Sequence, residues 1–171
     1  MLMNNNDILI RLRYALDLKN SEMKEIFELG GAEVTIEEVV MLLKKSKNNY
    51  QDESENVGNM ECTNDMLDAF LNGFITFKRG KQEPKPGQSE KPTLSITNNE
   101  SVNNIILKKL KIALTLTSEE MLDILDEAGI TVTKGELSAV LRKEGHKNYK
   151  ECGDRYVRNF LKGLALKYRD Q

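Results

Sequence analysis

Apolar residues near the start of the chain recur at the spacing of an α-helix. Residues 5–18 read NNDILIRLRYALDL. The apolar positions fall on one side of a helix that we expect over residues 6–17: Ile8, Leu9, Leu12, Ala15 and Leu16. Asn5 or Asn6 is the expected N-cap of this helix, because a side-chain amide oxygen can accept from the free N–H groups of the first turn.

Three further helices are expected in the first half of the chain. The second covers residues 21–29 and ends near Gly31, which suits a left-handed C-terminal cap. The third begins after Thr35, which has the T-x-x-E spacing of a capping box with Glu38. The fourth has the clearest helical repeat of apolar residues: Leu67, Phe70, Leu71, Phe74 and Ile75. No stretch alternates for long enough to predict a β-sheet.

The same pattern returns in the second half of the chain. Residues 103–116 read NNIILKKLKIALTL and repeat residues 5–18 at an offset of 98. This offset holds through the T-x-x-E motif of the third helix. It drops to 90 before the fourth helix, so the first copy has 8 extra residues in one loop. Matches of this density, in one order, indicate an internal duplication.

The predicted fold is all-α, with two homologous four-helix units arranged as a tandem duplication. The first unit covers residues 1–80 and the second covers residues 103–171. Residues 81–102 hold all three prolines among Gly, Ser, Lys and Glu, which is the composition of a linker. An interior glycine costs a helix about 1 kcal/mol, so the equivalent Gly73 and Gly163 predict close packing of another helix. We expect the two units to dock there, fourth helix against fourth helix.

Composition narrows the class of protein. The chain has 171 residues, of which 30% are charged and 39% hydrophobic, as in a globular protein. It has no apolar run near the ~18 residues of a membrane span and no secretory signal core, so we expect a cytoplasmic protein without a membrane partner. Residues 1–80 carry 9 Lys and Arg against 14 Asp and Glu, whereas residues 103–171 carry 13 against 10. Opposite charge favours docking of the two copies, or a different partner for each.

Three motifs in a fixed order resemble a known family. They are N-N-x-I-L-x-x-L-x-x-A-L, then G-x-x-V-T-x-x-E, and then E-C-x-[ND] before an F-L-x-G helix, and each occurs in both copies. Over nearly its whole length the chain is similar to the YehS-like bacterial proteins, which are built from a duplicated domain of unknown function. The resemblance implies a small cytoplasmic bacterial protein and carries over no catalytic residues.

Candidate catalytic groups are few. Cys62 and Cys152 each precede a fourth helix, whose N-terminus could stabilise a thiolate, but packing in the core is the more usual role of a free cysteine. His146 lies six residues before Cys152 and suggests a Cys–His pair, yet its match in the first copy is Asn48. We interpret it as an exposed loop residue. One His and two separated Cys are too few ligands for zinc, and we predict no catalytic residue, cofactor or metal.

The second copy offers a candidate nucleic-acid interface. Its second and third helices, within residues 118–143, resemble a helix–turn–helix pair. Seven nearby side chains could form one positive surface that meets phosphate: Arg142, Lys143, His146, Lys147, Arg155, Arg158 and Lys162. The turn at residues 129–132 is long for a DNA-reading motif, so a solvated charged face is the favoured interpretation. The asparagine pairs 5–6 and 103–104 could contact a ligand or a base edge, although helix capping accounts for them.

The sequence favours a non-enzymatic binding or adaptor protein, which recognises an unidentified protein partner on its helix faces or on the acidic loop of residues 46–59. The alternative is a nucleic-acid-associated regulator that uses the basic second copy. A thiol-dependent enzyme is a third and weaker hypothesis.

Overall fold

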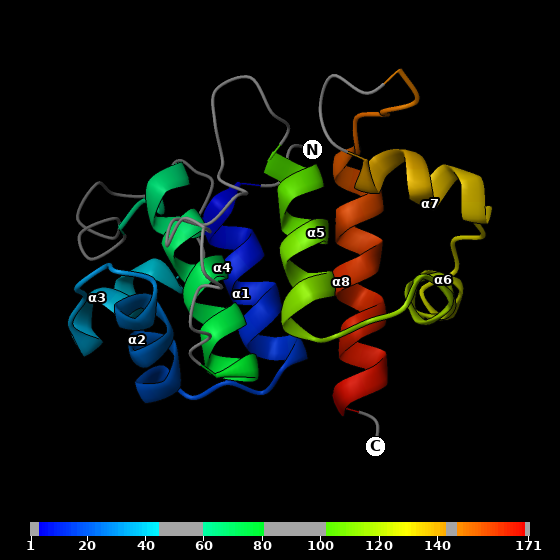
Figure 1. Ribbon diagram of the computed structural model, residues 1–171. Coiled ribbons are helices and arrows are strands. Elements are labelled where there is room, and N and C mark those ends of the chain that lie inside the picture. The colour runs from blue at the N-terminus through cyan, green and yellow to red at the C-terminus, as the bar shows by residue number, and fades with distance from the viewer. Residues whose placement is uncertain (1–3, 45–59, 81–101, 143–146, 170–171) are drawn as a thin grey trace, which may run out of the picture.

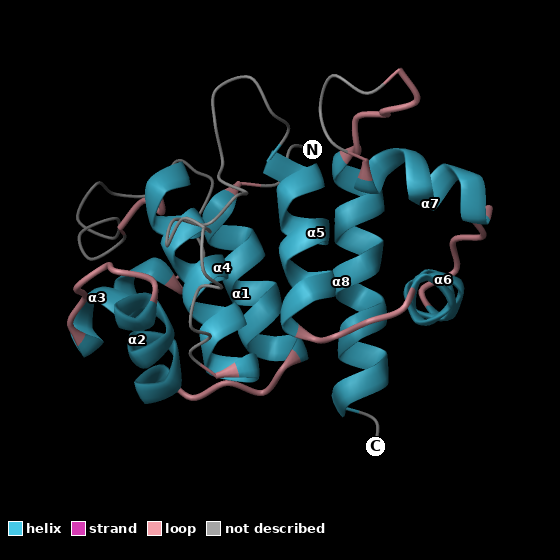
Figure 2. Ribbon diagram, viewed as in Figure 1, coloured by secondary structure: helices cyan, strands magenta, loops and turns pink. Residues whose placement is uncertain are grey.

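The computed structural model describes residues 4–44, 60–80, 102–142 and 147–169. In these ranges the chain forms helices and no strand (Figures 1 and 2), with these bounds: α1 Asn5–Ala15, α2 Asn20–Leu29, α3 Ile36–Leu42, α4 Asn64–Arg79, α5 Val102–Ala113, α6 Ser118–Glu127, α7 Lys134–Leu141 and α8 Asp154–Arg169. The all-α prediction is confirmed, and the helices form two equivalent sets, α1–α4 and α5–α8. The acidic loop and all of the expected linker except Val102 lie outside the described residues.

Local sequence signals set the helix ends. The Thr35 hydroxyl accepts from the Glu38 N–H at 3.1 Å, and the Glu38 carboxylate accepts from the Thr35 N–H at 2.9 Å. The capping box predicted for α3 is therefore present. Gly31 and Gly129 have φ angles of +94° and +93°, the left-handed conformation predicted after α2 and α6.

Helices α1, α4, α5 and α8 lie side by side in the centre of the molecule, with α2–α3 on one flank and α6–α7 on the other (Figure 1). The two halves meet where α1 packs on α8 and α4 packs on α5. Our expectation that the fourth helices dock on each other is therefore wrong. Helix α1 contacts α8 more extensively than it contacts α4, and α5 likewise contacts α4 more extensively than α8. Each first helix therefore needs the other unit to cover its apolar side. The pairs α1–α8 and α5–α4 are equivalent in the duplicated fold.

Gly73 and Gly163 mark close contacts, but these lie inside the units. A Cβ atom on Gly73 would lie 1.8 Å from the Ile26 carbonyl oxygen of α2. A Cβ atom on Gly163 would lie 2.1 Å from the Ile124 carbonyl oxygen of α6. Only glycine therefore lets each fourth helix approach the second helix of its own unit this closely. The predicted close packing is confirmed, and its expected partner is corrected.

One apolar core joins the two units. It contains the stripes of the first and fourth helices, including Leu12, Leu71, Leu110 and Leu161. Burying an aliphatic side chain of this kind contributes about 1.5–3 kcal/mol, so the core is the main source of stability. Among the described residues, no helix combines the length and the apolar character that membrane crossing requires.

Candidate binding surface across helices α1 and α8

The paired asparagines of the first repeat are used inside the fold. Asn4, not Asn5 or Asn6, is the N-cap of α1, and its side chain accepts from an N–H of the first turn at 2.8 Å. The Asn6 side chain donates to the Leu42 carbonyl at 2.9 Å and accepts from the Cys62 N–H at 2.9 Å. Asn5 donates to the Cys62 carbonyl at 3.1 Å. The pair ties α1 to the end of α3 and to the segment before α4, which corrects the capping expectation.

The second repeat has the same arrangement, which we call the Asn clamp. Asn104 is fully buried, donates to the Val140 and Lys150 carbonyls at 2.9 Å each, and accepts from the Cys152 N–H at 2.8 Å. Asn103 donates to the Cys152 carbonyl at 3.1 Å. These amides already bond to the backbone, so they are poor candidates for contact with a ligand or a base edge.

Both thiols are buried, with 3% of Cys62 and 2% of Cys152 exposed. Burial is the main reason that the pKa of each thiol rises to about 12, and the nearby carboxylates of Glu61 and Asp154 add to the rise. Because the thiolate is the reactive form, neither cysteine is a good nucleophile at neutral pH. The packing role favoured from the sequence agrees with this burial.

His146 and Lys143 lie outside the described residues, so the structure says nothing of the suggested Cys–His pair or of that part of the basic face. Among the side chains that the structure does describe, no three of His, Cys, Asp or Glu are grouped to hold a metal ion. The charged side chains on the surface are therefore the remaining candidates for a functional site.

The remaining basic residues of the predicted interface occupy three places. Arg155, Arg158 and Lys162 lie on α8 at i, i+3 and i+7, and so they share one side of the helix. Arg142 is the C-cap of α7, and Lys147 lies in an exposed turn before α8. Arg155 and Lys162 are exposed, and neither side chain forms a hydrogen bond or an ion pair with another described residue.

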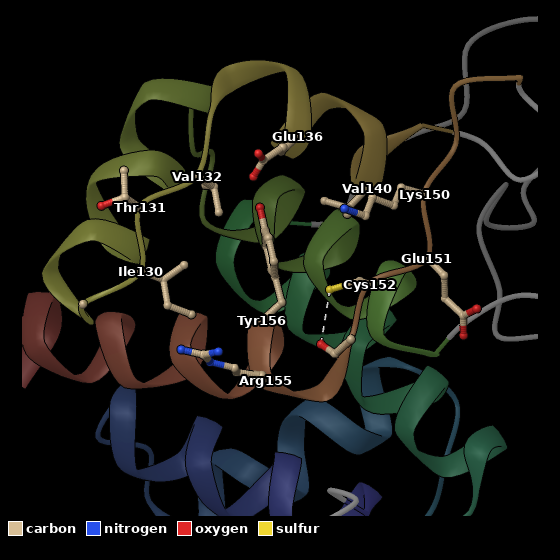
Figure 3. Close-up of a pocket in the computed structure, with 12 residues that line it drawn as sticks. Ile130, Thr131, Val132, Glu136, Val140, Lys150, Glu151, Cys152, Arg155 and Tyr156 are labelled. Carbon is tan, nitrogen blue, oxygen red and sulfur yellow. Dashed lines mark hydrogen bonds between the residues drawn. The ribbon is translucent and has the colours of Figure 1, made fainter.

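A pocket of about 490 Å³ opens beside this side of α8 (Figure 3). The α6–α7 turn, α7 and the segment leading into α8 line it, through residues that include Ile130, Val132, Glu136, Val140, Cys152, Arg155 and Tyr156. The Tyr156 hydroxyl points toward Glu136 in Figure 3, and burial is the main cause that raises its pKa to about 12. Met66 and Asp65 stand at the positions of Tyr156 and Arg155 in the first repeat, so this polar lining is not duplicated.

A second hollow, of about 360 Å³, follows the line between α1 and α8, and we call it the seam groove. Its lining is Asp7, Ile10, Arg11, Tyr14, Leu161, Lys162 and Ala165. Arg11 and Tyr14 were not predicted from the sequence, because charge counted within each repeat does not show which residues of the two repeats meet. These two residues lie beside α8 because α1 packs on the fourth helix of the other unit. The sequence gives one indication of their exposure, which is that neither residue belongs to the apolar stripe of α1.

The equivalent seam, between α4 and α5, contains a buried ion pair. Lys109 is 1% exposed and donates to Asp68 Oδ1 at 2.9 Å. It also donates to Asn72 Oδ1. Burial lowers the pKa of Lys109, and its bond to Asp68 opposes that change. This seam therefore supplies both the cation and the oxygens that accept from it.

The seam groove has a different set of charges. Arg11 stands at the position of Lys109, but Arg158 and Lys162 stand at the positions of Asp68 and Asn72. Neither Arg11 nor Lys162 pairs with another residue in the described ranges. Cations that line a hollow without an acceptor of their own suit an anion supplied from outside.

Comparison with known proteins shows which protein family this chain belongs to. A family model described as "Protein of unknown function (DUF1456)" matches residues 5–80 and 103–170. The chain belongs to this family. A relative, "Uncharacterized protein YehS" of Escherichia coli (strain K12), is 39% identical over 165 residues, which cover 96% of each chain. No solved structure matches. The YehS-like resemblance is confirmed, and the two DUF1456 segments agree with two four-helix units.

Proposed function

We propose that this DUF1456 protein is a binding or adaptor module without catalytic activity, and that the basic side of α8 recognises a protein partner. One observation carries the proposal. Arg155 and Lys162 are exposed, have no acceptor among the described residues, and lie on the helix that borders both hollows. The two thiols are buried and the asparagine pairs bond to the backbone, so these candidate functional groups have structural roles instead. This favours recognition over catalysis.

We place this protein in the cytoplasm. Both cysteines are free and buried, which is the usual state of cysteine in a reducing compartment. The partner is then a cytoplasmic protein with an acidic surface, because the unpaired charges on α8 are positive.

A nucleic-acid-associated regulator is the alternative. It draws support from the same residues, since Arg155 and Lys162 could contact phosphates. The α6–α7 helix pair supports it less well. Helix α6 reads SEEMLDILDE, and Glu119 on it pairs with Lys134 of α7 at 3.1 Å. An acidic helix next to α7, the recognition helix in this alternative, would repel a phosphate backbone.

Charge reversal on α8 tests the proposal. Full-length protein is immobilised and incubated with Escherichia coli extract at low salt, in parallel with an Arg155→Glu/Lys162→Glu variant. Lys19→Glu is the matched control, because Lys19 is exposed, lies outside both hollows and does not belong to the basic surface predicted from the sequence. Retained proteins are identified by mass spectrometry, and nucleic acid is detected by staining before and after nuclease treatment.

We expect a protein that the wild type and the control retain, that the double variant does not retain, and that about 0.5 M salt releases. Nuclease-sensitive material with the same dependence on α8 would favour the alternative. Equal retention by the double variant and the wild type would contradict both.

A further inference from the structure

Lys109 shows what a cation binds at its position in this fold. In the α4–α5 seam it donates to Asp68 Oδ1 at 2.9 Å, almost completely shielded from water. A charge-assisted bond of this kind is about twice as strong as a neutral one. The duplication places Arg11 at the same position of α1, facing α8 instead of α4.

In the seam groove no carboxylate stands on α8 at the position of Asp68, and the described residues show no ion pair between Asp7 and Arg11 on α1. Asp7 is the one acidic residue in its lining, and the Asp7 side chain accepts from the Asn4 N–H at 3.4 Å as part of the helix cap. Arg11 and Lys162 lie on opposite helices of the groove without acceptors in the described residues. A carboxylate therefore pairs with the cation in the α4–α5 seam, whereas the equivalent position in the α1–α8 seam has no carboxylate.

We propose that the seam groove binds a carboxylate-bearing amphipathic segment of a partner protein. An Asp or Glu of that segment lies between Arg11 and Lys162, as Asp68 lies beside Lys109. This inference rests on the proposed function and names the chemistry of the partner. The binding energy comes from the carboxylate and from the apolar side chains next to it.

Apolar residues line the groove together with the two cations. Leu161 is 1% exposed, and Ile10 and Ala165 are half-buried beside it. A helix with apolar residues on one side and carboxylates at the edges of that side would cover this lining and reach both cations. Such a combination of apolar centre and charged rim is usual where a helix binds in a groove.

A single-stranded nucleic acid fits the groove less well. It would need an open aromatic face on which a base can stack. Tyr14 is 59% exposed, but the Arg169 guanidinium lies 4.2 Å from the centre of its ring. Arg169 is held there, because it donates to the Tyr14 carbonyl at 2.9 Å and to Asp17 at 3.3 Å. One face of the Tyr14 ring is therefore covered, so Arg11 and Lys162 could contact phosphates but the groove offers a base only one face of one ring for stacking.

Three fluorescent probes test the proposal against the full-length protein by anisotropy. The first is a helical peptide of about four turns, with Leu on one side and Glu at its edges. The second is the same peptide with every Glu replaced by Gln. The third is single-stranded DNA of mixed sequence and the same net charge as the first peptide.

We expect the Glu peptide to bind about 10-fold more tightly than the Gln peptide. Arg11→Ala and Lys162→Ala should each weaken the Glu peptide about 5-fold, because each removes one of the two cations. Lys19→Ala, which removes an exposed cation outside the groove, should leave the affinity unchanged. Circular dichroism confirms that each variant is folded.

A second variant places the acceptor residues of the α4–α5 seam at the equivalent positions of the seam groove. Arg158→Asp/Lys162→Asn gives Arg11 the acceptors that Lys109 has, so the Glu peptide should no longer bind. If this variant does not fold, the two alanine variants still decide the question.

Equal affinity for the Glu and Gln peptides would overturn the proposal, as would alanine variants that bind like the wild type. Tighter binding of the DNA than of the Glu peptide would overturn it in favour of nucleic acid. If the peptides fail while extract still yields a partner that depends on α8, the inference is wrong and the proposed function stands.

Discussion

Replacing Gly73 by Ala is expected to force α2 and α4 apart. The added Cβ atom would lie 1.8 Å from the Ile26 carbonyl oxygen, 2.8 Å from the Gly30 nitrogen and 2.9 Å from the Ile26 carbonyl carbon. All three atoms belong to the backbone, so no side-chain rotation can relieve the contact. To restore even a 3.0 Å separation from the oxygen, α2 must move by about 1.2 Å (3.0 − 1.8).

The cost follows from two opposing effects. Overpacking that shifts backbone costs about 3 kcal/mol or somewhat more, whereas alanine gains about 1 kcal/mol over glycine inside a helix. The net loss of unfolding free energy is about 2 kcal/mol. With a urea dependence of about 2 kcal/mol per molar, the unfolding midpoint should fall by about 1 M in a circular-dichroism titration.

Gly135→Ala is the matched control. Gly135 lies in α7, and the nearest atom to an added Cβ is the Thr133 hydroxyl oxygen at 3.9 Å, an ordinary contact. Here only the helix propensity changes, so stability should rise by about 0.5 kcal/mol. If Gly73→Ala is as stable as the wild type, or if both variants shift in the same direction, the close approach of α4 to α2 is not real.

Three further outcomes test other parts of the structure. Asn104→Ala should lower the unfolding free energy by about 3 kcal/mol in urea, because it leaves the buried Val140 carbonyl and Cys152 N–H without a partner, together with the Lys150 carbonyl; a loss below 1 kcal/mol would contradict the Asn clamp. The folded pKa of Cys62 and Cys152 is about 12 against an ordinary 9.0, so the unfolded chain releases these protons first. Stability should therefore fall as pH rises from about 9 to 12, and less steeply in the double Cys→Ala variant; equal slopes would show that the thiols are not buried. Lys109→Met should destabilise by about 2 kcal/mol and Arg11→Met by no more than about 0.5, and equal losses would mean that the two seams do not differ.

The sequence by itself determined the helices and the duplication. Apolar spacing predicted a helix over residues 6–17, and α1 covers Asn5–Ala15. The Thr35 capping box and the left-handed Gly31 also follow from residues within one or two turns. Such features depend on local hydrogen bonds and local sterics, so a short stretch of sequence contains all the groups involved.

The tertiary structure alone decided which elements meet. An apolar stripe is not directional, so the stripe of α1 could cover its own fourth helix or that of the other unit, and only packing selects α8. The Asn6 amide could likewise bond to many backbone groups, and only the fold brings the Leu42 carbonyl, 36 residues away, within 2.9 Å of it. Arg11 and Lys162 become neighbours for the same reason, which is why charge counted along the chain does not reveal the seam groove. Packing sums contacts from distant parts of the chain, and local sequence does not encode that sum.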